Sequence, residues 1–183
     1  MANILIIYYS VNGSTKKMAR LIARGVEMIP DINSIIRTVG NDNQSADNSD
    51  PIVEISDLKE CSGLIIGSPT HFGNMAAPLK LFIDSTTAEW FNGTLTGKPA
   101  GVFTSTSSLH GGQETTLLSM MLPLIHHGMV IAGVPYSEKK LASTKSGGTP
   151  YGPSHVSFNT ETDIRKSKCP TSKRLTHTSG PRA

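Results

Sequence analysis

Six residues near the N-terminus, at positions 10–15, combine short hydroxyl and amide side chains with one glycine. They follow an apolar run at 3–9 and precede an amphipathic stretch, so they join a predicted strand to a predicted helix. Hydroxyl groups can bond phosphate oxygens, Gly13 lets the backbone approach, and the positive end of a helix attracts an anion. The segment matches neither the Walker A motif nor G-x-G-x-x-G, which favours a monophosphate over a triphosphate with magnesium. A plain N-capping turn is the alternative interpretation.

Two further polar loops follow predicted strands, at positions 68–75 and 105–114. Both contain small polar residues and glycine, so their backbone N–H and C=O groups could contact a flat heteroaromatic ring. In open parallel α/β sheets, ligands bind outside the carboxyl ends of the strands. We therefore expect both loops to flank the crevice that contains the first loop, although solvated turns are the alternative.

The elements that must position these loops can be read from the apolar pattern. Helical spacing follows Ser14, which is a candidate N-cap, and again follows Pro78. A third helix is predicted around 117–125, with Pro123 inside it and Gly128 closing it, and a short one at 56–61. Strands alternating with helices predict a parallel, doubly wound α/β sheet with right-handed crossovers. The predicted strands are 3–9, 32–39, 63–67, 99–105 and 129–134.

Length and composition favour one ordinary globular domain. The chain has 183 residues, of which 37% are hydrophobic and 17% charged. No apolar run approaches the roughly 20 residues of a membrane-spanning helix, so no transmembrane segment is expected. The apolar stretch at the N-terminus lacks a preceding basic residue and is short for a signal peptide, so we expect a cytoplasmic protein.

The positive net charge of +3 arises at the C-terminal end. Residues 157–183 contain six Lys or Arg residues against two acidic ones, which leaves 1–156 close to neutral. The segment has few large apolar residues and none at helical spacing, so a helix expected after the last strand is missing. We predict a folded domain at 1–156, a polar mobile loop at 40–51 and a poorly ordered basic tail at 157–183. Nucleic-acid binding through this tail would rest on charge alone, and we predict none.

Four motifs occur in an order that resembles the WrbA-type NAD(P)H:quinone oxidoreductases, and the likeness extends from residue 1 to about 156. The resemblance implies a flavodoxin-like three-layer sandwich with a five-stranded parallel sheet in the order 2-1-3-4-5. It also implies FMN as cofactor, NADH or NADPH as donor, a quinone as acceptor and no metal. A homotetramer with active sites shared between subunits is expected as well. The motifs are GSPTHFGNM at 67–75, FTST at 103–106 followed by GGQET at 111–115, HHGM at 126–129, and GGTPYG at 147–152.

The same resemblance implies roles for individual residues. The first loop would hold the FMN phosphate, the second would border the isoalloxazine ring, and the third would hold its pyrimidine edge. His126 would reach the flavin region across a subunit boundary, and Trp90 would help to wall the quinone and nicotinamide pocket. The implied cofactor-binding residues are Ser10, Val11, Asn12, Gly13, Ser14, Thr15, Thr70, His71, Phe72, Gly73, Ser105, Thr106, Ser107, Ser108, Leu109, His110 and Gly111.

Three features depart from that family. Asn12 stands where many members have an aromatic residue, His71 replaces a common arginine, and the final amphipathic helix is missing. A histidine in a last helical turn also suits the helix dipole without any function, and a lone tryptophan can serve packing alone. These are the alternatives for His126 and Trp90.

The resemblance implies ping-pong hydride transfer through flavin N5, chemistry that the cofactor carries and the protein orients. Two other functions remain open. One is a flavodoxin-type electron carrier, although such carriers usually have acidic surfaces for docking. The other is a catalytically impaired flavin-fold protein, which would follow from the altered C-terminal end.

Overall fold

The computed structural model describes residues 1–40, 50–144 and 146–157. Its central sheet has the order β2-β1-β3-β5-β6, which confirms the predicted strand order. All four pairings along this path are parallel. The path comprises β1 (Ala2–Tyr8), β2 (Ile32–Thr38), β3 (Gly63–His71), β5 (Pro99–Thr106) and β6 (Val130–Ile131).

Two short strands that the sequence analysis does not predict extend this sheet at its carboxyl edge. β4 (Asn74–Met75) pairs antiparallel with the end of β3. β7 (Ser154–Val156) pairs in parallel with the end of β5, beyond the short β6. Both additions therefore lie beside the loops that were expected to bind a ligand.

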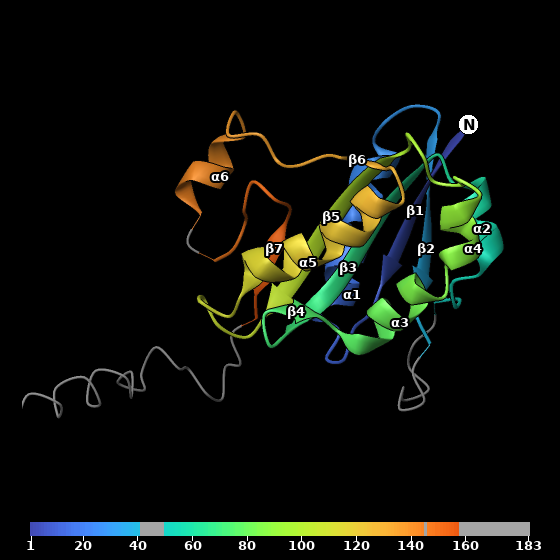
Figure 1. Ribbon diagram of the computed structural model, residues 1–183. Coiled ribbons are helices and arrows are strands. Elements are labelled where there is room, and N and C mark those ends of the chain that lie inside the picture. Colours follow the sequence, from blue (N-terminus) through green and yellow to red (C-terminus); the bar gives the residue numbers. More distant parts are fainter. Residues whose placement is uncertain (41–49, 145, 158–183) are drawn as a thin grey trace, which may run out of the picture.

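The helices lie on both faces of the sheet, with α1 behind it and α3, α4 and α5 in front (Figure 1). Successive side chains of β1 point to opposite faces of the sheet. Leu5 and Ile7 belong to one core cluster, whereas Ile6 and Tyr8 belong to the other. The first cluster also contains residues of α2, α3 and α5, and the smaller second cluster contains residues of α1. The helices are α1 (Ser14–Glu27), α2 (Ile55–Glu60), α3 (Ala77–Asp84), α4 (Thr87–Phe91), α5 (Gln113–His126) and α6 (Lys139–Ser143).

Several details of the predicted elements are wrong, and β3 extends to His71 instead of ending at 67. Ser14 is the first residue of α1 rather than its N-cap, because Gly13 precedes the helix in the left-handed conformation, at a φ of 80°. The last main strand spans Val130–Ile131 instead of 129–134. Its chain leaves β5 early, and the N–H of Val134 donates to the carbonyl oxygen of Pro150 at 2.9 Å.

After β6 the described residues contain one further helix, the five-residue α6, and it buries none of its side chains. Figure 1 shows α6 apart from the face of the sheet that α1 covers. Most of the predicted tail, 158–183, and most of the predicted loop, 41–49, lie outside the described residues. No helix among the described residues combines the length and apolar character that a membrane crossing requires.

A partly buried polar cluster connects the end of β1 to α1. The Tyr8 hydroxyl donates to Oδ2 of Asp50 at 2.7 Å, and Arg20 forms an ion pair with the same carboxylate. Burial raises the pKa of Tyr8, and the hydrogen bond to Asp50 raises it further. Tyr8 is therefore protonated throughout the physiological range, and the last residue of β1 before the first loop is held in place.

The ring of Phe103 on β5 lies directly over Gly67, its partner on β3. A Cβ at position 67 would lie 2.0 Å from Cζ of Phe103, which no rotamer of a fully buried phenylalanine can easily relieve. Gly67 therefore lets Phe103 cover the sheet on the face of α1, immediately before the second loop.

We expect Gly67→Ala to lower the free energy of unfolding by about 1–3 kcal/mol, because the core is overpacked. Gly101→Ala is the matched control, since a Cβ there has its nearest neighbour at 3.8 Å. The measurement is urea unfolding of the two variants beside the native protein. Equal stabilities of the two variants would contradict this account, and adding Phe103→Leu to Gly67→Ala should recover part of the loss.

Candidate functional site

The first loop joins β1 to α1 and presents the start of that helix. No side chain caps α1, and its first turn has no acidic residue. The N–H of Lys17 makes a backbone bond to the carbonyl oxygen of Gly13, at 2.9 Å. The start of α1 therefore presents the positive end of its helix dipole to an anion.

The second loop is a tight hairpin between β3 and β4. Phe72 and Gly73 form its turn with φ angles of 52° and 76°, and Phe72 is fully exposed. Positive φ at both positions is the backbone of a type I′ turn, in which a phenylalanine is unusual. On the strand before the turn, Thr70 Oγ1 lies 3.1 Å from Thr116 Oγ1 and 3.2 Å from Thr104 Oγ1. These hydroxyls tie the second loop to β5 and α5.

The third loop folds back on itself after β5. The N–H of Ser108 donates to Thr106 Oγ1 at 3.1 Å, and the N–H of Gly111 donates to the Ser108 carbonyl oxygen at 3.1 Å. β7 supports the loop from the other side. Ser105 Oγ lies 3.2 Å from Nδ1 of His155, and the N–H of Ser157 donates to the Thr106 carbonyl oxygen at 2.7 Å.

The three loops enclose one cavity of about 210 Å³. Most of the predicted cofactor residues line it, and they come from all three loops as expected from parallel strands. Two lining residues were missed in the sequence analysis, Pro69 and Ser157. The predicted residues along the cavity are Ser10, Val11, Asn12, Ser14, Thr15, Thr70, His71, Ser105, Thr106 and Ser107.

The remaining predicted cofactor residues are not among those that line the cavity. Gly13 shapes the loop backbone with its positive φ, and Phe72 and Gly73 form the hairpin turn that follows His71. The last four predicted residues of the third loop, Ser108 to Gly111, lie in the segment that folds back on Thr106. Of the two missed residues, Pro69 stands within a motif quoted above, whereas nothing in the sequence marks Ser157.

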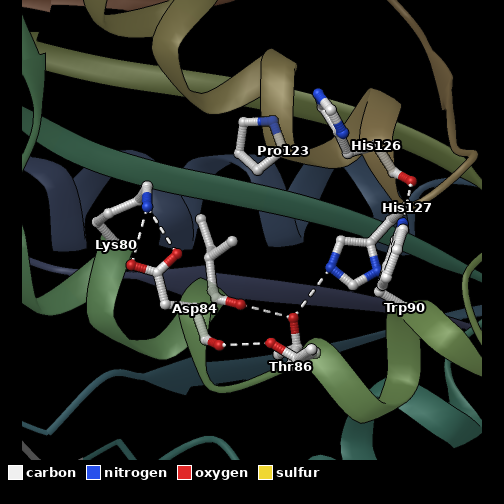
Figure 2. Close-up of a pocket in the computed structure, with 9 residues that line it drawn as sticks. Lys80, Asp84, Thr86, Trp90, Pro123, His126 and His127 are labelled. Atoms are coloured by element: carbon white, nitrogen blue, oxygen red, sulfur yellow. Dashed lines mark hydrogen bonds and ion pairs between the residues drawn. The ribbon is translucent and has the colours of Figure 1, made fainter.

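Trp90 and His126 lie together in a different pocket, of about 370 Å³, which shares no residue with the first. The indole N–H of Trp90 donates to the backbone carbonyl oxygen of His126 at 2.8 Å (Figure 2). The two predicted catalytic residues are thus brought together, but away from the cofactor cavity of the same chain. The pocket is lined by Lys80, Ile83, Asp84, Thr86, Thr87, Trp90, Pro123, His126 and His127.

Comparison with known proteins identifies the family. The model of the NADPH-dependent FMN reductase family matches residues 2–140. The chain belongs to this family. A relative in Solidesulfovibrio magneticus, an NAD(P)H dehydrogenase (quinone), is 39% identical over 166 residues, which are 82% of this chain and 81% of that protein.

Solved structures show the same fold as this FMN reductase family member. A flavodoxin, WrbA-like protein from Agrobacterium tumefaciens superposes with a TM-score of 0.63 and 24% identity, over 88% of this chain and 87% of that one. Oxidised Flavodoxin 1 from Bacillus cereus superposes with a TM-score of 0.60 and 19% identity, over 97% of this chain and all of the other. The flavodoxin-like fold predicted from the sequence is confirmed.

The cavity has the chemistry that an FMN phosphate requires. The Ser10 hydroxyl is buried and has no hydrogen-bond partner among the described residues. Native proteins seldom leave such a group unpaired, because its desolvation costs about 1–3 kcal/mol. It lies in a cavity of hydroxyls at the start of α1, so a phosphate oxygen would supply the missing acceptor.

We therefore expect Ser10→Ala to weaken binding of FMN by roughly 10- to 100-fold, the loss of one hydrogen bond to a charged group. Binding of riboflavin, which lacks the phosphate, should be unchanged. The ligand-free variant should unfold no more easily than the native protein, because the hydroxyl it loses is unpaired. Fluorescence titration with both flavins measures the affinities, and equal weakening of the two would show that Ser10 acts on the fold instead.

Proposed function

We propose that this protein is an FMN-dependent NAD(P)H:quinone oxidoreductase that reduces quinones by two electrons. The observation that carries the proposal is the hydroxyl-lined cavity at the start of α1, with the unpaired Ser10 hydroxyl in it, in a chain of the FMN reductase family. The relative from Solidesulfovibrio magneticus, named for quinone and NAD(P)H, supports the choice of substrates.

We assign to each of the three loops the cofactor-binding role that the sequence analysis expects. Ser10 to Thr15 would hold the phosphate, while Thr70 and His71 would border the ring from the end of β3. Ser105 to Ser107 would hold the opposite edge. When bound, FMN supplies the acceptance and release of a hydride equivalent, and the protein contributes orientation and shielding from water.

His71 is the one titratable side chain on the wall of the cavity among the described residues. Its ring makes an edge contact with Tyr9, with the two ring centroids 6.5 Å apart. No carboxylate lines the cavity there, so the described wall repels neither the phosphate nor a negatively charged reduced ring. The wall thus suits a cofactor that gains negative charge on reduction.

Purified protein reconstituted with FMN should oxidise NADH or NADPH with benzoquinone as acceptor. Because both substrates would use one pocket in turn, initial rates at several quinone concentrations should give parallel double-reciprocal lines. An electron carrier would instead accumulate a one-electron-reduced flavin and show no direct turnover with a nicotinamide. Protein that binds no FMN would support the catalytically impaired alternative.

We also propose that the protein assembles as a homotetramer with shared active sites. Trp90 and His126 lie in a pocket separate from the cofactor cavity, so a second copy would have to bring them to it. Large apolar side chains are exposed on the layer formed by α3, α4 and α5, and three of them form a stripe along α5 at helical spacing. They are Leu81, Phe91, Leu118, Leu122 and Ile125. A cytoplasmic location stays a prediction of the sequence.

Leu122→Glu should therefore dissociate the assembly, because it places a charge in the middle of the exposed stripe on α5. Leu21→Glu is the control, since Leu21 is equally exposed but lies on α1, behind the sheet. Light scattering gives the mass, and FMN titration and quinone turnover give the function. Leu122→Glu should bind FMN as chains of lower mass with strongly reduced turnover, whereas a fully active single chain would contradict shared sites.

A further inference from the structure

The pocket of Trp90 contains a second histidine, His127, which appears above only within the motif HHGM at 126–129. The side chain of His127 is 8% exposed, and its Nε2 lies 2.9 Å from Oγ1 of Thr86. Thr86 stands between α3 and α4, whereas His127 directly follows α5. This contact therefore joins two segments that are 41 residues apart in the chain.

The hydrogen bonds of Thr86 fix the direction of this contact. The Thr86 hydroxyl also lies 2.7 Å from the carbonyl oxygen of Ile83, which can only accept. Its single proton is used there, so its oxygen must accept from the Nε2–H of His127. The other ring nitrogen, Nδ1, is buried without a partner among the described residues.

The electrostatics around His127 favour the neutral ring. Burial lowers its pKa, the nearby His126 lowers it further, and the buried Glu89 opposes them. A charged ring would place a second proton on Nδ1, where no described group can accept it. His127 thus serves as a fixed, uncharged donor.

A second hydrogen bond between the same segments runs in the opposite direction. Trp90 lies one helical turn after Thr86, and its backbone N–H donates to the Thr86 carbonyl oxygen at 3.0 Å. Its indole N–H donates to the carbonyl oxygen of His126, the residue before His127. Figure 2 shows the two contacts side by side at the end of α5. Thr86 and Trp90 are thus each bonded to one of two consecutive histidines.

We propose that Thr86 and His127 are positioning residues that hold Trp90 and the end of α5 as one rigid unit for substrate binding. The proposal rests on the proposed function with shared sites, in which a second copy brings the pocket of Trp90 to the cofactor cavity. Two hydrogen bonds fix both the separation and the rotation of α4 relative to α5, whereas the indole bond alone would act as a hinge. The ring plane of Trp90 is then set before the substrate arrives.

Thr86→Val tests this because it keeps the shape of the side chain and removes the acceptor. The protein has a single tryptophan, so the indole N–H resonance in an NMR spectrum reports Trp90 alone. Ser85→Ala is the matched control, because the Ser85 hydroxyl also donates to a carbonyl oxygen three residues earlier but is exposed and contacts neither histidine. Thr86→Ser retains the hydroxyl.

We expect Thr86→Val to shift or broaden the indole resonance and to raise the quinone KM by about tenfold, with FMN affinity unchanged. Ser85→Ala and Thr86→Ser should match the native protein. If Thr86→Val does not fold, His127→Gln and His127→Asn replace it. The Gln amide can reach the position of Nε2 and should keep the indole resonance, whereas the shorter Asn should not.

The proposal is overturned if Thr86→Val and Ser85→Ala give the same indole resonance and the same KM. It is also overturned if FMN affinity falls in parallel with turnover, because the pair would then serve the fold alone. Native protein that binds FMN but shows no quinone turnover would defeat the proposed function itself, whatever the variants of Thr86 show.

Discussion

Parallel pairing of β1, β3 and β5 is the constraint on which the rest of the molecule depends. Because the three strands run in the same direction, the loops that follow them meet at a single edge of the sheet. The small residues of these loops can approach one another there, and the start of α1 adds a positive dipole to the same place. Neither lysine nor arginine lines the described wall of the cavity, so backbone N–H groups and hydroxyls would supply most of the donors. Such a site recognises a phosphate by direction and hydrogen bonding more than by net charge.

The order of apolar and polar residues was enough to predict the features that depend on residues close together in the chain. Continuous apolar runs indicated the buried strands, and the segments between these runs were long enough for helices. The first loop could therefore be placed between β1 and α1. The sequence pattern did not show that Gly13, rather than Ser14, would precede the helix, because both residues are compatible with a helix start. β7 has only three residues and pairs with a strand about 50 positions earlier, so its signal is too weak to separate from a loop. Ser157 was missed for that reason.

The link between Thr86 and His127 was invisible for a different reason. A threonine after one helix and a histidine after another are both common, and each has a local explanation. Their role depends on tertiary packing, which buries His127 and places the Thr86 oxygen within hydrogen-bond distance of its ring. The resemblance to WrbA-type enzymes pointed to His126 and Trp90, which share the indole hydrogen bond, whereas Thr86 and His127 form the second hydrogen bond between the same segments. Buried polar pairs of this kind have a large penalty when one member is lost, which makes them suited to fixing geometry.

The hairpin turn at Phe72 bears on how the two pockets relate. A phenylalanine in the left-handed region is less stable than asparagine or glycine there by about 1 kcal/mol. Within the described chain the exposed ring gains no burial that would offset this cost. The turn thus carries a large exposed apolar ring directly after His71 of the cavity wall, while apolar side chains of α3 to α5 are exposed on the layer in front of the sheet. Both features are costly for an isolated chain and would become favourable in the proposed assembly, where a second copy would bury them. The same burial would bring a partner's tryptophan pocket towards the cavity, so substrate binding and assembly would draw on one set of contacts.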